Sequence, residues 1–497
     1  MTQRTASPGL GSLGSGAVTA ASLGVQTGLA AVVGVIIARE FGRSAETDGF
    51  FAAYGVFAVA VLAAQAIRIT VLPPLTRARA GGRLTGETAS YALSLACLAA
   101  PILVASIVAA GPIARLLTAD GPTSAQDAAA AALPWMMVAA GAQLFAGLGA
   151  SALAALDDYV VAASGYIVGS VSGLVFILLR VDDDGIQAVS WGMALNGVVA
   201  ATVPALALAL RGRALRVPRS AARPHGPGLV RRLTELGQGV SLPLALQAVY
   251  LVCLPFAARE GVGAVTSFGY AYLLAAALVA TTASSLGIVT AVPLTRGGLD
   301  RPATARHIVA SSWIALTVIG GAAGVFATAG EPILSAVLGQ AYERDVGSEL
   351  GRLVVWFAPW AVAAVGVSVT FPLVFVARRV RRLPLLAVAV LVVHLPLAWG
   401  LQVLAGLDGL ALALALTTGL ALAVMLVGLE ALGPATRGLG TAAVLVAVIA
   451  VGAFGAVAVV TGPAASGALG IAVYGALLAV LRPSGLRRSW HYLRALR

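Results

Sequence analysis

The chain has 497 residues, of which 59% are hydrophobic and only 10% are charged. A soluble protein of this size carries about 25% charged residues, so the composition excludes a water-soluble globular protein. The net charge of +12 would suit nucleic-acid binding, but the distribution of the arginines, described below, excludes that function. We therefore expect an all-α polytopic membrane protein.

Apolar runs of about 20 residues, each enough to cross a hydrocarbon core as a helix, recur along the whole chain. Charged or Gly/Pro-rich breaks divide them into about fourteen predicted transmembrane helices. Their expected limits are 15–38, 50–75, 89–111, 129–155, 159–179, 187–210, 234–258, 263–292, 307–329, 349–376, 384–404, 409–430, 438–461 and 464–481. Gly165, Gly169 and Gly173, spaced four residues apart, predict a glycine face for close helix packing.

The arginines predict the orientation, because cytoplasmic loops are enriched in basic residues. With both termini inside, 24 arginines fall in inside segments and 7 outside, whereas 14 acidic residues lie outside and 6 inside. The heaviest inside loop carries seven arginines between Arg211 and Arg232. We therefore predict a multi-pass protein with both termini cytoplasmic, whose arginine loops meet anionic membrane lipids and no nucleic acid.

Four short matches recur in the same order in the two halves of the chain. The sequence ARE occurs at 38–40 and 258–260, PLTR at 74–77 and 293–296, GPIARLL and EPILSAVL begin at Gly111 and Glu331, and PW occurs at Pro134 and Pro359. The offsets are 220, 219, 220 and 225 residues. They indicate a duplicated unit of about six helices, with the last two helices outside it.

The duplication predicts four segments. Residues 1–210 form an N-lobe of helices 1–6, residues 211–233 a basic cytoplasmic linker, residues 234–432 a C-lobe of helices 7–12, and residues 433–497 two additional helices and a basic tail. Because six is even, the two lobes form a parallel repeat, related by an axis along the membrane normal. In transporters, such lobes enclose a substrate cavity that opens alternately to either side.

Arg68 is unusual because it lies inside an apolar run, where an arginine costs about 2.5–3.5 kcal/mol. Gln65 lies one turn earlier on the same helix face. Two interpretations are open. In the first, Arg68 snorkels to the cytoplasmic end or pairs with an acid; Arg77 lies nine residues later, about 13 Å along a helix. In the second, Arg68 lines a central cavity and binds an anion, for which phosphate suits its donors.

Other polar residues inside the predicted helices are candidates for lining the same cavity, although each also suits a helix–helix hydrogen bond. They are Gln26, Thr27, Gln247, Tyr250 and Ser285. The chain has no Ser/His/Asp set, no metal-ligand spacing and no nucleotide-binding loop, so we expect neither an enzyme nor a cofactor. Cys97 and Cys253 both fall in apolar runs, which predicts packing and no disulfide.

The stretch IIAREFGRSAETDGFFAAY, residues 36–54, resembles the MurJ/MviN family. These are lipid II flippases of the multidrug/oligosaccharidyl-lipid/polysaccharide (MOP) exporter superfamily. The matching residues are Ala38, Arg39, Phe41, Gly42, Thr47, Asp48, Phe50, Phe51 and Ala53, and VLPPL matches the family's helix end. The resemblance implies two six-helix lobes plus two final helices, a MOP/MATE-like fold in the bacterial cytoplasmic membrane. It also implies a gating role for Asp48, which would pair with an outer arginine such as Arg259, and Arg39 is a further gating candidate; the alternative is that Asp48 is a solvated loop acid.

The chain departs from that family in the arginines that line its cavity. Val33 and Gly34 stand where the family carries Arg-Asp, and Tyr272 and Leu273 replace its acid and base in the eighth helix. Tyr272 is therefore a substrate-binding candidate by position. Most of the family's cationic cavity is missing, and either Arg68 substitutes for it or the substrate is less anionic.

The resulting hypothesis is an alternating-access flippase for a polyprenyl-diphosphate-linked glycan, lipid II or a related lipid-linked saccharide. One alternative is a MATE-like exporter of small amphiphiles, which would normally have twelve helices and acidic residues in its cavity. Another is a non-transporting cell-envelope scaffold related to MurJ, with cell-wall synthesis proteins as partners.

Overall fold

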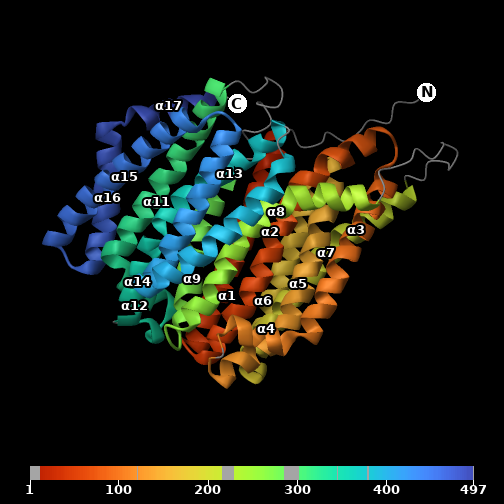
Figure 1. Ribbon diagram of the computed structural model, residues 1–497, viewed down its shortest axis with the longest axis horizontal. Helices are drawn as coiled ribbons and strands as arrows, with labels where there is room; N and C mark the ends of the chain where they lie inside the picture. The colour runs from red at the N-terminus through yellow and green to blue at the C-terminus, as the bar shows by residue number, and fades with distance from the viewer. Residues whose placement is uncertain are drawn as a thin grey trace. The chain divides into compact units, whose positions relative to one another are not determined.

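The computed structural model describes residues 12–119, 121–214, 229–284, 301–343, 345–377 and 380–495, and all elements in these ranges are helices (Figure 1). In the first half of the chain they are α1 Ser12–Phe41, α2 Ala45–Ala80, α3 Leu84–Val108, α4 Ala110–Leu117, α5 Thr123–Ala155, α6 Tyr159–Asp184, α7 Gln187–Ala214 and α8 Leu229–Ala258. In the second half they are α9 Ala264–Val279, η1 Ala280–Ser284, α11 Arg301–Leu338, η2 Gln340–Tyr342, α12 Asp345–Trp356, α13 Ala358–Val376, η3 Val380–Arg382, α14 Leu383–Gly428, α15 Leu432–Val460, α16 Pro463–Leu481 and α17 Ser484–Ala495.

The predicted all-α membrane fold is confirmed. Within the described residues, 12 helices are long and apolar enough to cross a membrane, or up to 13 if a bent pair near the C-terminus counts as one span. Two predicted spans, 384–404 and 409–430, are run together as α14, which breaks at Ala405 and Gly406. The predicted span 349–376 is divided between α12 and α13.

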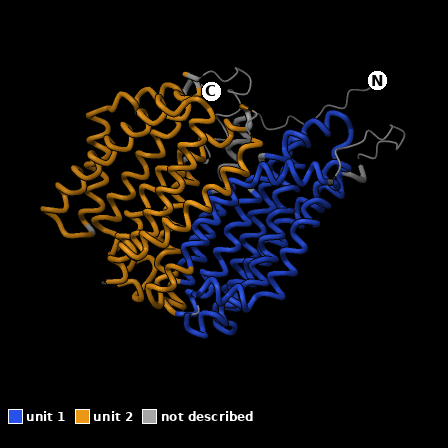
Figure 2. The backbone as a smooth tube through the Cα atoms, viewed as in Figure 1, with its two compact units in different colours: residues 1–37, 45–254 blue, residues 38–44, 255–497 orange. Residues whose placement is uncertain are grey.

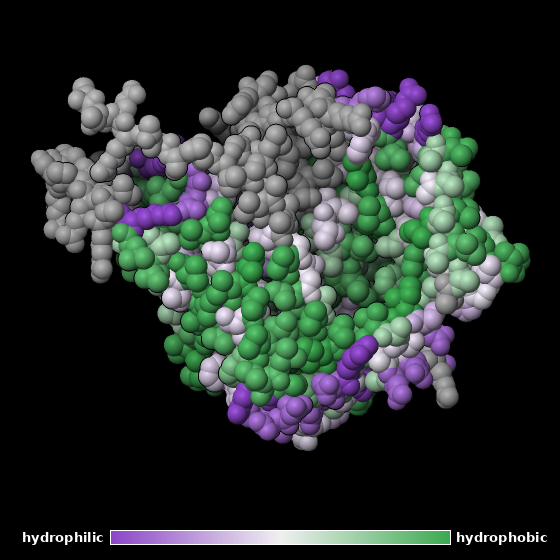
Figure 3. All heavy atoms as spheres, turned by 180° about the vertical axis from the view of Figure 1, so that it is seen from behind, coloured by the Kyte–Doolittle hydropathy of each residue, from purple (hydrophilic) through white to green (hydrophobic). Residues whose placement is uncertain are grey.

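The surface has the character expected of a multi-pass membrane protein. On the face drawn in Figure 3, hydrophobic side chains cover most of the described surface, and hydrophilic ones gather near helix ends. Large exposed side chains project from helix interiors, among them Leu179 at 73%, Val392 at 65% and Val451 at 74% exposure. So much apolar surface is found where a protein meets lipid or a partner, not where it meets water.

The chain divides into two compact units (Figure 2). Unit 1 comprises residues 1–37 and 45–254, and unit 2 comprises residues 38–44 and 255–497. The short segment 38–44 joins α1 to α2, yet by its contacts it belongs to unit 2. The four segments expected from the repeat are defined by sequence alone and stay a prediction.

Unit 1 is built around α2 and α5, which pack along each other, with α7 against α5 and α6 against α7. Its core contains Val71, Leu75, Leu95, Leu148 and Val240. The predicted glycine face of α6 is confirmed. A Cβ on Gly169 would lie 2.6 Å from the backbone oxygen of Asn196, so these two helices touch backbone to backbone.

Replacing Gly173 by alanine is expected to force α6 and α7 apart. The new Cβ would lie 2.6 Å from the Gly192 carbonyl oxygen and 2.9 Å from the Cβ of Asn196. Overpacking of this kind costs about 1–3 kcal/mol, which lowers the midpoint of thermal unfolding in detergent. Gly455→Ala in α15 is the control, since its Cβ would meet nothing within 4 Å. Equal midpoints for the two variants would contradict the packing argument.

Ion pairs connect the ends of neighbouring helices in unit 1. Arg232, only 2% exposed, donates from Nη2 to Glu87 Oε2 at 2.9 Å and lies 4.7 Å over the Tyr91 ring. It thereby ties the start of α8 to the start of α3. The turn between α5 and α6 holds two further arginines, because Asp157 pairs with Arg79 and Asp158 with Arg211. These contacts connect the ends of α2 and α7 to that turn.

Unit 2 has several smaller cores arranged along α11. Trp313 and Leu316 of α11 pack with Val446 of α15, and Phe454 packs with Tyr474 of α16. The Tyr474 hydroxyl donates to the Thr317 carbonyl oxygen at 2.8 Å. The two additional helices, α15 and α16, therefore pack directly on α11.

The positions of helix breaks repeat between the two halves. Ala109, which separates α3 from α4, has φ −102 and ψ 19, and Ala329, 220 residues later, interrupts α11 with φ −128 and ψ 16. Gly185 ends α6 with φ 58 and ψ −145, and Gly406 interrupts α14 with φ 56 and ψ −134. These backbone conformations recur at the offset of the short sequence matches, which supports a duplicated six-helix unit.

Candidate functional site

Arg68 lies in the interior of unit 1 and is half-buried. Its guanidinium carbon is 5.7 Å from the centroid of the Tyr166 ring on α6, and its Cγ lies beside Gly147 of α5. A cation over an aromatic face gains about 0.5–2 kcal/mol, which offsets part of the cost of burying it. Among the described residues, no carboxylate forms an ion pair with Arg68.

Helix α2 does not end at its two prolines. It continues through Pro73 and Pro74 to Ala80, so Arg68 lies twelve residues from the helix end, about 18 Å along the axis. An arginine side chain is too short to cover that length. This geometry argues against snorkelling to the end of α2 and favours a partner inside unit 1.

The face of α2 that carries Arg68 is directed at α5 and α6. A Cβ on Gly147 would lie 3.2 Å from the Ala64 carbonyl oxygen and 3.4 Å from Arg68 Cγ, whereas Thr70 lies against Gly239 of α8. Two residues along a helix correspond to about 200° of rotation, so Arg68 and Thr70 lie on opposite faces. Arg68 therefore points away from α8.

The predicted amides and hydroxyls are not gathered around Arg68. Gln26 of α1 is half-buried and donates to the Ser22 carbonyl oxygen of its own helix at 3.2 Å; Thr27, beside it, is half-buried too. Gln247 and Tyr250, on α8, are buried at 3% and 1% exposure. Tyr250 packs toward Gly55 of α2. These side chains are placed like helix-packing residues, and a role in substrate binding stays a prediction.

Of the three remaining substrate-binding candidates, only Tyr272 has a side chain that the structure describes. Tyr272 of α9 is 6% exposed and lies in an aromatic cluster, with ring centroids 5.0 Å from Trp360 and 6.0 Å from Phe357. Gln65 is in α2, but its side chain lies outside the described residues, and so does the whole of Ser285. Position alone therefore supports the last two candidates.

Of the three gating candidates, Arg39 has the most defined contacts. It donates from Nε to the Val337 carbonyl oxygen and from Nη2 to the Ala336 carbonyl oxygen, both at 3.0 Å. These carbonyls end α11, and a cation is favourable at the negative end of a helix dipole. Asp48 is buried in the first turn of α2, and Arg259 is exposed, 5.2 Å from the Phe256 ring centroid.

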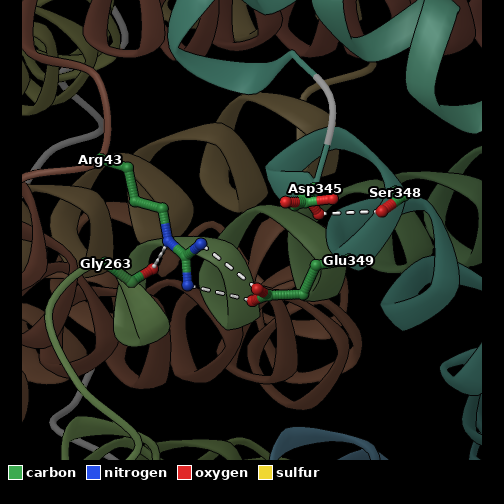
Figure 4. Close-up of polar contacts among 5 residues, drawn as sticks. All are labelled: Arg43, Gly263, Asp345, Ser348 and Glu349. Carbon is green, nitrogen blue, oxygen red and sulfur yellow. Dashed lines mark hydrogen bonds and ion pairs between the residues drawn. The ribbon is translucent and has the colours of Figure 1, made fainter.

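A second arginine of the same segment, Arg43, makes a bidentate ion pair within unit 2. It binds Glu349 of α12 with two parallel hydrogen bonds, Nη2 to Oε1 at 3.0 Å and Nη1 to Oε2 at 3.3 Å, and donates from Nε to the Gly263 carbonyl oxygen at 2.8 Å (Figure 4). Bidentate pairs of this kind fix orientation as well as charge. We call the contacts of Arg39 and Arg43 with unit 2 the 38–44 clasp.

Gly263 is a position of the clasp where glycine is required. Its φ of +84 lies in the left-handed region, which disfavours other residues. A Cβ there would also lie 2.1 Å from Arg43 Cγ. The backbone between α8 and α9 therefore approaches Arg43 closely enough to accept its hydrogen bond only without a side chain.

Sequence reasoning missed Arg43 as a functional candidate, although it lies in the FGRS stretch quoted for the family resemblance. Its partner is 306 residues further on, and a loop arginine by itself indicates only topology. Its spacing of four residues from Arg39 carries no signal either, because α1 ends at Phe41 and Arg43 lies beyond the helix.

The sequence matches no protein-family model and no curated protein. The fold, however, is found in solved structures. A lipid II flippase MurJ in an inward closed conformation aligns with a TM-score of 0.73 and 13% identity, covering 93% of this chain and 98% of that one. An inward-facing MATE family multidrug transporter of the MOP superfamily aligns with a TM-score of 0.63 and 14% identity, covering 84% and 94%. A MATE transporter from Vibrio cholerae aligns with a TM-score of 0.55 and 16% identity, covering 85% and 98%.

This chain therefore has the fold of the MOP-superfamily transporters. Within that class, its architecture is similar to the MurJ flippase over 93% of this chain. At 13% identity the likeness defines the fold and leaves the substrate to be inferred from the side chains.

Proposed function

We propose that this protein is an alternating-access transporter that exports a polyprenyl-diphosphate-linked glycan across the bacterial cytoplasmic membrane. The observation that carries the proposal is Arg68, a cation inside unit 1 with an aromatic neighbour and no carboxylate partner among the described residues. A permanent charge within a membrane span is costly when it has no counter-ion, so such residues mark sites for substrates or ions.

Diphosphate suits this site for two reasons. The guanidinium presents a planar set of donors that match phosphate oxygens in pairs. A lipid-linked substrate also reaches its site from within the bilayer, so that its apolar chain stays in lipid while the charged head group enters the protein.

The 38–44 clasp supplies a candidate for the moving part. It holds the α1–α2 connection by three arginine hydrogen bonds to backbone carbonyls and one bidentate ion pair. Ion pairs at this level of exposure, 20% and 27% for the two side chains, are worth about 1 kcal/mol or less, and so they can break and re-form during a transport cycle.

A MATE-like exporter of cationic amphiphiles is the second candidate, favoured by the likeness to MATE structures. The aromatic cluster of Tyr272, Phe357 and Trp360 would suit such a substrate, because aromatic faces attract cations. The cationic Arg68 would repel it.

A transport assay with two substrate classes tests the proposal. The purified protein is placed in vesicles that contain either a polyprenyl-diphosphate saccharide or an entrapped cationic dye. Exposure of the saccharide to an impermeant lectin, faster than in protein-free vesicles, is the expected result. Dye movement alone would favour the MATE-like function. Neither movement, from protein shown to be folded, would overturn the transporter proposal and favour the scaffold.

A further inference from the structure

The last described helix, α17, runs nearly perpendicular to the helix before it. The axis turns by 83° between Ala465–Leu481 and Ser484–Tyr492, and Arg482 at the turn adopts a left-handed conformation with φ 41. A helix of 12 residues is about 18 Å long, too short to cross a hydrocarbon core of roughly 30 Å. α16 has 19 residues and none of them is charged, which at about 1.5 Å per residue is nearly enough to cross the hydrocarbon core without α17. With α16 across the membrane, the 83° turn directs α17 along the plane of the bilayer.

One face of α17 is anchored to α11. The hydroxyl of Tyr492 lies 3.2 Å from His307 Nδ1, and Leu486 packs in the core of Trp313 and Leu316. A Cβ on Gly485 would lie 2.3 Å from the Trp313 ring, so the start of the helix sits directly on that indole. These anchors fix which side of α17 faces the protein.

The opposite face of α17 is basic and aromatic. Arg487, Arg488 and His491 are exposed, and Trp490 is 52% exposed. Arg306 of α11 and Arg437 of α15 are exposed as well, and Arg306 precedes the histidine that binds Tyr492. The sequence from residue 431 to 497 contains six arginines and no acidic residue.

We infer that α17 is an interfacial helix whose exposed face binds the head groups of anionic phospholipids. Helices that lie in the membrane interface combine arginines with tryptophan in this way, the arginines meeting phosphate groups and the indole sitting at head-group level. The 83° turn directs α17 along the membrane surface, and its contacts with α11 hold it there. Because residues 431–497 contain no acidic residue, the charge of the exposed face is complementary to anionic head groups. The inference does not depend on transport and holds under the scaffold alternative.

The test measures the affinity of the purified full-length protein for phosphatidylglycerol and for phosphatidylcholine, by native mass spectrometry from detergent. We expect tighter binding of phosphatidylglycerol. Each arginine near an anionic surface contributes about fivefold in affinity, so the double variant Arg487→Gln/Arg488→Gln should weaken phosphatidylglycerol binding by roughly 30-fold. Phosphatidylcholine binding should not change.

A double variant of unit 1, Arg115→Gln/Arg180→Gln, is the matched control, because it removes the same charge from other exposed positions. It should change phosphatidylglycerol affinity by less than twofold. Equal losses in the two double variants, or no preference for phosphatidylglycerol in the wild type, would overturn the inference. A second readout uses brominated phosphatidylglycerol, which should quench wild-type fluorescence more than that of Trp490→Phe; equal quenching would place α17 away from the lipid.

Discussion

Reversing the charge of Arg43 is expected to release segment 38–44 from the rest of unit 2. Arg43→Glu removes the bidentate pair with Glu349 and the hydrogen bond to the Gly263 carbonyl oxygen, and it brings two carboxylates together. The ion pair contributes about 1 kcal/mol or less at this exposure. The charged hydrogen bond to the Gly263 carbonyl oxygen contributes about 1.5–3 kcal/mol, so the backbone of this segment should open at least tenfold more often.

Hydrogen–deuterium exchange of the peptide that covers 38–44 measures that opening. The swapped pair, Arg43→Glu with Glu349→Arg, should restore the slow exchange, because it recreates the ion pair with its polarity reversed. Arg259→Glu is the control for a general charge effect, since Arg259 is exposed and its guanidinium lies over Phe256. Unchanged exchange in Arg43→Glu would show that the clasp does not hold the segment.

Removing the guanidinium of Arg68 is expected to weaken binding of a short-chain polyprenyl diphosphate by about 10- to 100-fold, the value of one charged hydrogen-bonding group. Arg68→Lys should lie between the wild type and Arg68→Ala, because lysine keeps the charge and loses the paired donors. Calorimetric titration in detergent measures these affinities directly.

Two controls separate binding from folding in that experiment. Arg79→Ala removes an arginine from the same helix, at its end, where it pairs with Asp157. It should bind the diphosphate as the wild type does. The thermal unfolding midpoint of Arg68→Ala should stay within a few degrees of the wild type, since no carboxylate among the described residues loses a partner. A loss below twofold in Arg68→Ala would remove Arg68 from the binding site.

The transmembrane helices were predictable because lipid imposes one simple rule, that about 20 apolar residues cross the bilayer. The glycine face of α6 followed from spacing alone and is confirmed by the contact of Gly169 with Asn196. This rule does not predict short helices. The eight residues of α4 and the twelve of α17 are too few to form a hydrophobic span, and their place in the fold depends on what they pack against.

Site residues were harder to predict because a polar side chain inside a helix either stabilises the packing of the helices or binds a substrate. Gln26 satisfies its own backbone at Ser22, and Tyr272 fills an aromatic cluster with Trp360, although each resembles a cavity residue in the sequence. Arg43 is the opposite case. In the sequence it resembles a loop arginine that only indicates the side of the membrane, but in the structure it pairs with Glu349. What distinguishes these cases is which side chains and backbone groups each residue meets in the fold, from four residues away for Gln26 to 306 for Arg43, and one sequence does not contain that information.

The most direct test of the proposed function is the rate at which vesicles containing the protein move a polyprenyl-diphosphate saccharide between leaflets. We predict rapid lectin access with the wild type, access reduced at least tenfold with Arg68→Ala, and wild-type rates with Arg79→Ala. Vesicles with folded Arg68→Ala that flip the lipid as fast as the wild type would contradict the role given to this arginine inside unit 1.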